Sequence, residues 1–459
     1  MISVKSLTIH FFVLLGLTFP SLKANECEDT FESEKSVDAI KNEKVTDLKL
    51  SNGMRVLLKK TDFDSDEFFI QMVAKGGALG LPESERPLAN LSHETVWAAG
   101  LGDYSNDQLN SLMYRKGVEL SSRIDKFSRV IEGNSTSEGA ETLFNLIHLL
   151  FTKPNFSKES LSEVLKETID ASKLRHFDFE NNFEDLSKSL NAPSFSGFQH
   201  PSLKNISKDI SIEQIKNNYT KSVEDPGEWQ TVIVGDFDLE EMTKLIHRYF
   251  ENIPAKKNIV WPRYSQDAGN PSFPKDITRK KISNGKRGDS LTRMTFPIPF
   301  AINAENYNTV MGIIQLIEIH LRNKIQSEFK KTQGLDVSLE FPFFPYKDNL
   351  WLFVQFRSKP QDTERIETLV IQGIQDLAQI GPTEDELNLL KEQQTNTDEL
   401  WMKHNCYWQA NLMNYLLWGW DPKKFSKEDL FLNATPKMVQ NWIEENINLK
   451  NYSILIASP

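Results

Sequence analysis

The chain reads Thr231-Val232-Ile233-Val234-Gly235-Asp236, and a helix signal follows from Leu239 to Phe250. A run of apolar, mostly β-branched residues without polar alternation is typical of a strand that is buried on both faces. Such a strand, followed by a Gly-Asp turn and a helix, predicts a sheet that is covered by helices. We therefore expect an α+β fold in which helices cover a mostly antiparallel sheet.

The residues before this strand predict the rest of a first domain. Asn52-Gly53 lies between two apolar runs, which is the strongest short-range signal of a β-hairpin. Apolar residues then recur with strand or helix periodicity as far as the closing strand. We expect further strands at residues 68–74, 118–122 and 129–133, and helices at residues 87–99, 105–116, 138–151, 160–190 and 239–250.

A second domain follows a proline-rich stretch and repeats the same plan. Its expected strands are at residues 291–296, 335–341 and 350–356, and its expected helices are at residues 303–329, 363–380 and 383–420. Two similarly built domains predict an internal duplication. The expected divisions are a signal peptide at 1–24, a charged linker at 25–44, a first domain at 45–256, a second linker at 257–276 and a second domain at 277–459.

The N-terminus and the composition predict an exported protein. Lys5, an apolar run from Leu7 to Leu17 and Ala24 form the pattern of a signal peptide, and no later stretch is apolar enough to span a membrane. The formal net charge of −11 argues against nucleic acid as a partner. The only cysteines, Cys27 and Cys406, allow one disulfide, and the sequence does not decide whether they form it.

Several strings resemble the pitrilysin/insulinase family of zinc peptidases, the inverzincins, over Val45 to Pro459. They are Leu50 to Leu57, Asp225 to Trp229 with Val232 to Asp238, Leu321 to Val337, and Asn405-Cys406-Tyr407-Trp408. The likeness is greatest to the half without zinc in long bacterial periplasmic members, which makes the bacterial periplasm the expected location. Family enzymes consist of two halves that close around a chamber for peptides, and this chain is similar to one such half-shell.

The resemblance also indicates lost catalysis. The family signature is His-x-x-Glu-His on a helix, whose imidazoles hold zinc while the Glu acts as base. The corresponding window reads Asn90-Leu91-Ser92-His93-Glu94, so Asn90 and Glu94 replace the imidazoles and His93 replaces the base. We expect a partly exposed polar pair, His93 and Glu94, on an ordinary helix and no bound cofactor. A weak or altered zinc site at these two residues is the alternative.

The groups that hold the substrate carbonyl in the family are also replaced. An Arg and a Tyr, seven residues apart, donate hydrogen bonds to the oxyanion in active relatives. The resemblance puts Gln326 and Gln333 at these positions, and neither has a charge or an acidic proton. Arg322, one helical turn earlier, is not expected to substitute. The acidic residues Glu159, Glu163, Glu167 and Asp170 are interpreted as the solvated face of a helix.

Three functions stay open from the sequence. The first is a non-catalytic subunit that forms a heterodimer with an active zinc-bearing half and completes a peptide chamber. The second is an active zinc metalloendopeptidase with altered ligands around His93, and the third is a stand-alone extracytoplasmic protein that binds peptides. Two aromatic groups are interpreted as core, or as a surface for a partner or peptide: the run from Phe341 to Tyr346, and the cluster Trp401, Tyr407, Trp408, Tyr415, Trp418 and Trp420.

Overall fold

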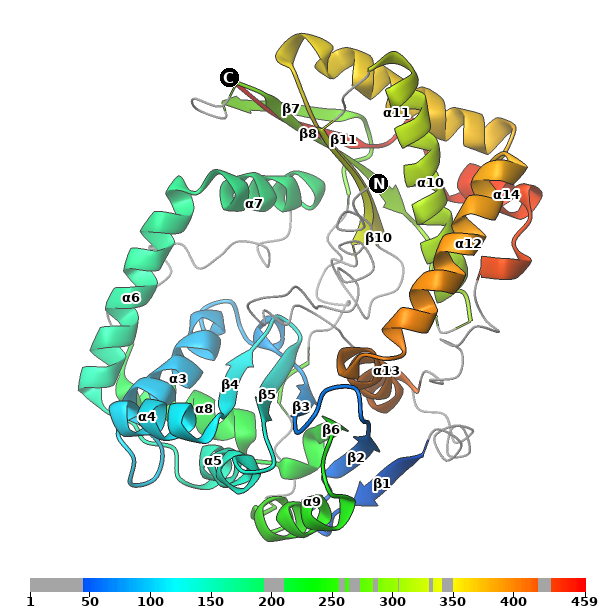
Figure 1. The fold of residues 1–459 in the computed structure, drawn as a ribbon. Helices are drawn as coiled ribbons and strands as arrows, with labels where there is room; N and C mark the ends of the chain where they lie inside the picture. The colour runs from blue at the N-terminus through cyan, green and yellow to red at the C-terminus, as the bar shows by residue number, and fades with distance from the viewer. Residues whose placement is uncertain are drawn as a thin grey trace.

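The computed structural model describes most of the chain as two lobes, each built on one sheet (Figure 1). The described residues are 44–193, 210–255, 261–263, 273–283, 288–303, 305–329, 333–340, 350–419 and 431–459. The expected signal peptide, Cys27, Trp420 and the run from Phe341 to Tyr346 lie outside these ranges. We call residues 45–255 the first lobe and residues 273–459 the second lobe. No helix in the described ranges combines the length and apolarity that a membrane span needs.

The first lobe holds a six-stranded sheet. Its strands are β1 (Val45–Lys49), β2 (Arg55–Lys60), β3 (Phe68–Lys75), β4 (Glu119–Ile124), β5 (Ser128–Ser135) and β6 (Trp229–Gly235). They lie in the order β1-β2-β6-β3-β5-β4, and only β2 and β6 run parallel. The expected hairpin is present, because β1 and β2 pair across the Asn52-Gly53 turn, where Gly53 has a φ of 95°.

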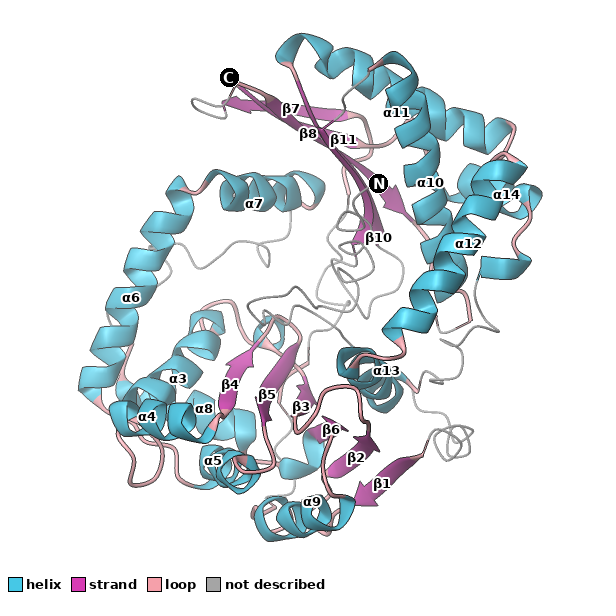
Figure 2. Ribbon diagram, viewed as in Figure 1, coloured by secondary structure: helices cyan, strands magenta, loops and turns pink. Residues whose placement is uncertain are grey.

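Helices of the first lobe cover one face of this sheet (Figure 2). They are α3 (Arg86–Ala99), α4 (Asn106–Lys116), α5 (Ala140–Thr152), α8 (Ile212–Val223) and α9 (Leu239–Leu245), which a π-helical turn extends to Phe250. Ser105 and Ser211 each begin a helix with a capping box, which satisfies backbone donors of the first turn. Alternate strand residues such as Ile70 and Ile131 pack against the apolar side of α5, including Leu143.

The second lobe holds a five-stranded sheet. Its strands are β7 (Thr278–Ser283), β8 (Ser290–Ile298), β9 (Gln333–Glu340), β10 (Leu350–Ser358) and β11 (Ser453–Ser458). They lie in the order β7-β11-β8-β10-β9, and only β7 and β11 run parallel. Four helices cover one face: α10 (Tyr307–Glu328), α11 (Thr363–Gln379), α12 (Glu384–Trp401) and α14 (Pro436–Asn446).

The two sheets have the same topology once β1 is set aside. In each, the first strand of the lobe lies parallel to the last, and the second, fourth and third strands follow in that spatial order. The predicted duplication and the α+β fold of two mostly antiparallel sheets are therefore confirmed. Strands β7 and β11 and helices α8 and α14 were not predicted. The edge strand β7 reads Thr-Arg-Lys-Lys-Ile-Ser and lacks the apolar alternation that marks a strand.

The single helix predicted over residues 383–420 is wrong. The chain forms two helices, α12 and α13 (Asn405–Trp418), which are separated by Met402–His404. His404 has extended backbone angles, and the side chain of Asn405 leaves the second lobe to bond with the first: its Oδ1 accepts from Thr61 Oγ1 at 2.5 Å and its Nδ2 donates to Asp64 at 3.0 Å. No proline or glycine marks the break, so only this tertiary contact explains it.

Each sheet has a second apolar face, and a helix from the other lobe covers it. Helix α13 packs on β3 and β6, where Trp408 and Leu412 join Val73 and Val232 in one buried cluster. Helix α7 (Phe179–Asn191), at the end of the long helix α6 (Lys158–Phe177), packs on β11. Figure 1 shows α6 reaching from the first lobe to α7 beneath the second sheet. The lobes thus exchange one helix in each direction.

The exchanged helix α13 gives a structural meaning to the Asn405-Cys406-Tyr407-Trp408 string. Besides the bonds of Asn405, the Nζ of Lys59 lies 3.9 Å from the centre of the Trp408 ring, and the Arg55 guanidinium stands 5.5 Å from the Tyr415 ring. Tyr407, Trp408 and Tyr415 are buried. These three aromatic residues are therefore core, as expected.

We predict that replacing Leu412 by Ala destabilises both lobes together. Leu412 is fully buried and lies between Trp408 and Tyr415 on one face of α13. Its truncation should lower the free energy of unfolding by about 2–5 kcal/mol, as for other core leucines. The matched control is Leu400→Ala on α12, where the leucine is 63% exposed. Urea denaturation followed by tryptophan fluorescence and circular dichroism measures both. Equal midpoints for the two variants would contradict the packing described here.

Candidate functional site

Helix α3 carries the positions that correspond to the family signature. The helix begins with Pro87 in its first turn, where a missing N–H costs nothing, and it ends at Gly100 with a φ of 94°. Asn90 and Glu94, four residues apart, are both exposed and share one side of the helix. His93 points into the core and is only 1% exposed. The expectation of a partly exposed His93 is therefore wrong, whereas Glu94 is exposed as expected.

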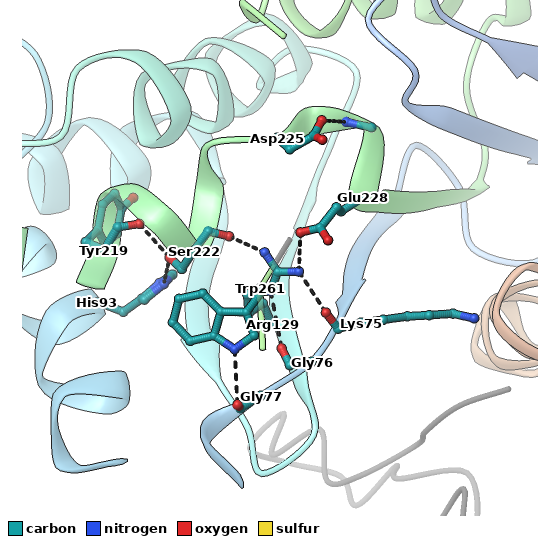
Figure 3. A network of polar contacts seen from close by, with 11 residues as sticks. Lys75, Gly76, Gly77, His93, Arg129, Tyr219, Ser222, Asp225, Glu228 and Trp261 are labelled. Carbon is teal, nitrogen blue, oxygen red and sulfur yellow. Dashed lines mark hydrogen bonds and ion pairs between the residues drawn. The ribbon is translucent and has the colours of Figure 1, made fainter. Parts of the chain in front are cut away.

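Both ring nitrogens of His93 have partners, and Figure 3 shows the one formed by Ser222. Nδ1 lies 2.9 Å from Ser122 Oγ, and Nε2 lies 3.1 Å from Ser222 Oγ. Ser222 donates its hydroxyl proton to the Tyr219 carbonyl at 2.7 Å, so its oxygen must accept from Nε2–H. Ser122 accepts from Trp97 Nε1 at 3.0 Å and is free to donate to Nδ1. The hydrogen bonds therefore require the neutral tautomer with its proton on Nε2.

The surroundings of His93 keep it neutral. Burial and the nearby Arg129 guanidinium lower its pKa to about 3. A proton on Nδ1 would also leave the hydroxyl proton of Ser122 without its acceptor. The ring packs against Tyr219, with a centroid distance of 4.7 Å. A neutral, enclosed imidazole has neither the charge nor the access to water that the base of a zinc peptidase needs.

Arg129 is the centre of a buried polar network beside His93 (Figure 3). Its guanidinium donates to the carbonyls of Lys75 at 2.7 Å, Gly76 at 3.2 Å and Ser222 at 2.7 Å, and it pairs with Glu228 at 2.6 Å. One side chain thus joins β3, β5, α8 and the turn before β6. The sequence interpretation missed this residue, although an arginine next to Val130 and Ile131 in an expected buried strand is a usable signal.

Trp261 anchors part of the predicted linker to the same place. It is 1% exposed, its Nε1 donates to the Gly77 carbonyl at 3.1 Å, and its ring stands 5.4 Å from the Arg129 guanidinium. Glycines make room for it: a Cβ on Gly80 would come within 2.0 Å of the Pro262 carbonyl oxygen. The linker predicted over residues 257–276 is therefore fixed to the first lobe at this tryptophan.

The exposed side of α3 faces α6. Glu94 lies against Thr168 and Glu167 of that helix, and partial burial together with the Glu167 charge raises the pKa of Glu94. This is the place where a zinc ion would be held if Asn90 and Glu94 were histidines. Asn90 offers only an uncharged amide, and His93 turns away. Across the described residues, no three His, Cys, Asp or Glu side chains come together as a metal site. The residues present do not fit a zinc ion.

The second pair of predicted positions lies in the other lobe. Gln326 is exposed near the end of α10, and Gln333 begins β9, where it pairs with Arg357 of β10. Both elements belong to the second lobe, and Figure 1 places α10 on the opposite side of the molecule from α3, which carries Asn90 and Glu94. Arg322 bonds to Glu318 and to the Leu335 carbonyl at 3.0 Å. These bonds hold its guanidinium against its own lobe.

Comparison with known families and proteins gives a consistent picture. The family model described as "Peptidase M16 inactive domain" matches residues 209–394. The protein named "Probable zinc protease PqqL" from Haemophilus influenzae is 23% identical over 358 residues, which are 76% of this chain and 36% of that protein. Its namesake from Escherichia coli is 20% identical over 413 residues, or 88% of this chain and 42% of that protein. The chain thus spans less than half the length of these relatives.

Solved structures share the fold at low sequence identity. The periplasmic protease PqqL from Escherichia coli superposes with a TM-score of 0.74 at 16% identity, over 90% of this chain and 45% of that one. The first half of the same protease gives a TM-score of 0.72 at 15% identity, covering 91% and 92%. An M16 inactive domain from Pseudomonas fluorescens gives 0.65 at 16% identity, covering 91% and 98%.

The buried histidine predicts a specific loss of stability in acid. Because the folded-state pKa of His93 is about 3 and an unfolded histidine titrates near pH 6.5, the unfolded chain binds one more proton between these values. The folded state should therefore lose about 1.4 kcal/mol per pH unit from this residue as the pH falls from 6.5 toward 3. His93→Gln, which can still accept from Ser122 and donate to Ser222, should reduce that slope. Urea midpoints at several pH values measure it, and an unchanged slope would contradict the assignment.

Proposed function

We propose that this chain, which belongs to the pitrilysin/insulinase (M16) peptidase family, is a non-catalytic half-shell that pairs with a zinc-bearing half and completes its peptide chamber. The proposal rests mainly on the burial and the neutral charge of His93. The residue at the position of the catalytic base is buried and neutral, and both of its nitrogens bond to serines. The positions of the two imidazole ligands hold an amide and a carboxylate.

The chemistry of a zinc peptidase supports the same conclusion. Zinc lowers the pKa of its bound water only when protein ligands hold the ion, and a base must then take the proton of that water. Asn90 and Glu94 lack the imidazole pair, and Gln326 and Gln333 lack the charge and acidity of the usual oxyanion donors. A zinc ion at His93 would have to displace Ser122 or Ser222 and open the core around Tyr219.

Three observations support a partner of the same family. The match to the M16 inactive domain crosses from the first lobe into the second. The chain covers nearly all of a separately solved half of PqqL and less than half of whole PqqL. This chain covers 45% of the periplasmic protease PqqL from Escherichia coli, and the remainder of that protease supports the existence of a second half that would supply the catalytic groups. The apolar N-terminal segment and that relative also support export to the periplasm.

The first test is the zinc content of the purified protein after zinc has been supplied and unbound metal removed. We expect far less than one zinc per chain and no peptide hydrolysis. About one zinc per chain that is lost in His93→Ala, together with chelator-sensitive hydrolysis, would overturn the proposal in favour of a peptidase with altered ligands. A monomer without zinc that binds peptides firmly and ignores any zinc-bearing half would favour a stand-alone binding protein.

The second test restores the ligands. Asn90→His combined with Glu94→His puts two imidazoles four residues apart on the exposed side of α3, next to Glu167. We expect this double variant to gain up to one zinc per chain by elemental analysis, and the single variant Asn90→His to gain far less. Neither should hydrolyse peptides, because the neutral His93 cannot act as base. Hydrolysis by the double variant would show that position 93 is not the reason for inactivity.

A further inference from the structure

The two lobes meet mainly through the helices that they exchange. Among the described elements, the most extensive packing between lobes is that of α13 on β3 and β6, and of α7 on β11. Helix α13 also contacts β2, and α7 also contacts β8. An exchanged helix should therefore move with the lobe on which it packs. The flexibility of the segment that leads to this helix determines whether the two lobes can move relative to each other.

Helix α7 is bound to the second sheet by both charged and apolar contacts. Glu184 pairs with Arg293 of β8 at 2.6 Å, and Asn191 accepts from Ser453 at 2.5 Å and donates to Thr295 at 3.2 Å. Phe183 is 2% exposed within a cluster of β8 and β11 side chains. Asn191 is fully buried, so removing the helix would leave its amide without partners. The helix belongs to the first lobe by sequence and to the second by contact.

The segments that lead to α7 and α13 pack much less tightly than these two helices do. In α6, Leu161 and Val164 are buried against α3, Leu165 packs on the same cluster, and Thr168 contacts Glu94. Beyond Thr168, no side chain as far as Leu174 is buried, and Leu174 is 72% exposed. A short helical segment without tertiary packing, such as this part of α6, is only marginally stable in water, because helices in proteins are stabilised mostly by packing. The α12–α13 junction is similar, since Lys403 and His404 are exposed. The other crossings between lobes run through residues outside the described ranges.

We infer that the protein moves as two rigid bodies that are joined by hinges. These bodies are not identical with the two lobes, because each includes one helix of the other lobe. One body is the first sheet with its own helices and α13, and the other is the second sheet with its own helices and α7. The bodies move by bending at residues 169–174 of α6 and at Met402–His404. Such motions use a few residues at the ends of elements, which absorb the change in backbone angles. The inference goes beyond the proposed function and does not depend on a partner.

Hydrogen exchange with mass spectrometry of the whole protein tests the hinge. We expect amides of residues 169–174 to exchange at least about tenfold faster than those of residues 160–164 in the same helix. Amides of α7 should be protected as strongly as those of β11, and amides of residues 402–404 should exchange quickly. Uniform protection along α6 would overturn the hinge. Exchange of α7 together with residues 169–174 would overturn the assignment of α7 to the second body.

A pair of variants separates bending from detachment of α7. Ala171→Pro introduces a helix breaker at an exposed position of the unpacked part of α6. If this part is a hinge, exchange should quicken there while the protection of α7 stays the same. The matched variant Phe183→Ala removes the buried contact of α7 itself and should lower the protection of α7 but not of residues 160–164. Loss of α7 protection in Ala171→Pro would show that α6 holds α7 in place, which contradicts a hinge.

Discussion

The exchange of helices between the lobes is the constraint on which the structure depends. Each sheet has two apolar faces, and the helices of its own lobe cover only one of them. An uncovered face would expose a large apolar surface to water, so α7 and α13 must cross. The crossing explains why α6 extends far beyond its packed part and why the helical stretch after residue 383 breaks before Asn405. It also makes the two duplicated lobes one folding unit.

The candidate site shows how polar side chains can form part of a buried core. A buried polar side chain is tolerated when all of its hydrogen bonds are made, and His93 meets this condition through Ser122 and Ser222. Arg129 uses four of its five N–H donors in bonds to three carbonyls and Glu228. The two groups share Ser222, which accepts from His93 through its hydroxyl and from Arg129 through its carbonyl. In this chain, the helix on which the resemblance places the catalytic signature is thus joined to α8 and the sheet by a polar network.

The sequence correctly predicted those elements whose conformation is determined by neighbouring residues. The Asn52-Gly53 hairpin, the repeated order of elements and most helices were readable because period and turn residues agree there. The break at residues 402–404 and the burial of Trp261 depend on contacts with distant residues, and no neighbouring residue signals them. The exposure of Glu94 was predicted correctly. The burial of His93 could not be predicted, because its partners Ser122 and Ser222 are brought to it only by the folded sheet and α8.

Reconstitution with a zinc-bearing half tests the central claim, that this chain completes another subunit's chamber, most directly. A family member from the same organism with an intact His-x-x-Glu-His helix is mixed with increasing amounts of this chain, and peptide hydrolysis is measured. Our account predicts that activity rises on addition and levels off at one chain per zinc-bearing half. Hydrolysis by this chain alone, or no effect on any zinc-bearing half at saturating amounts, would contradict it.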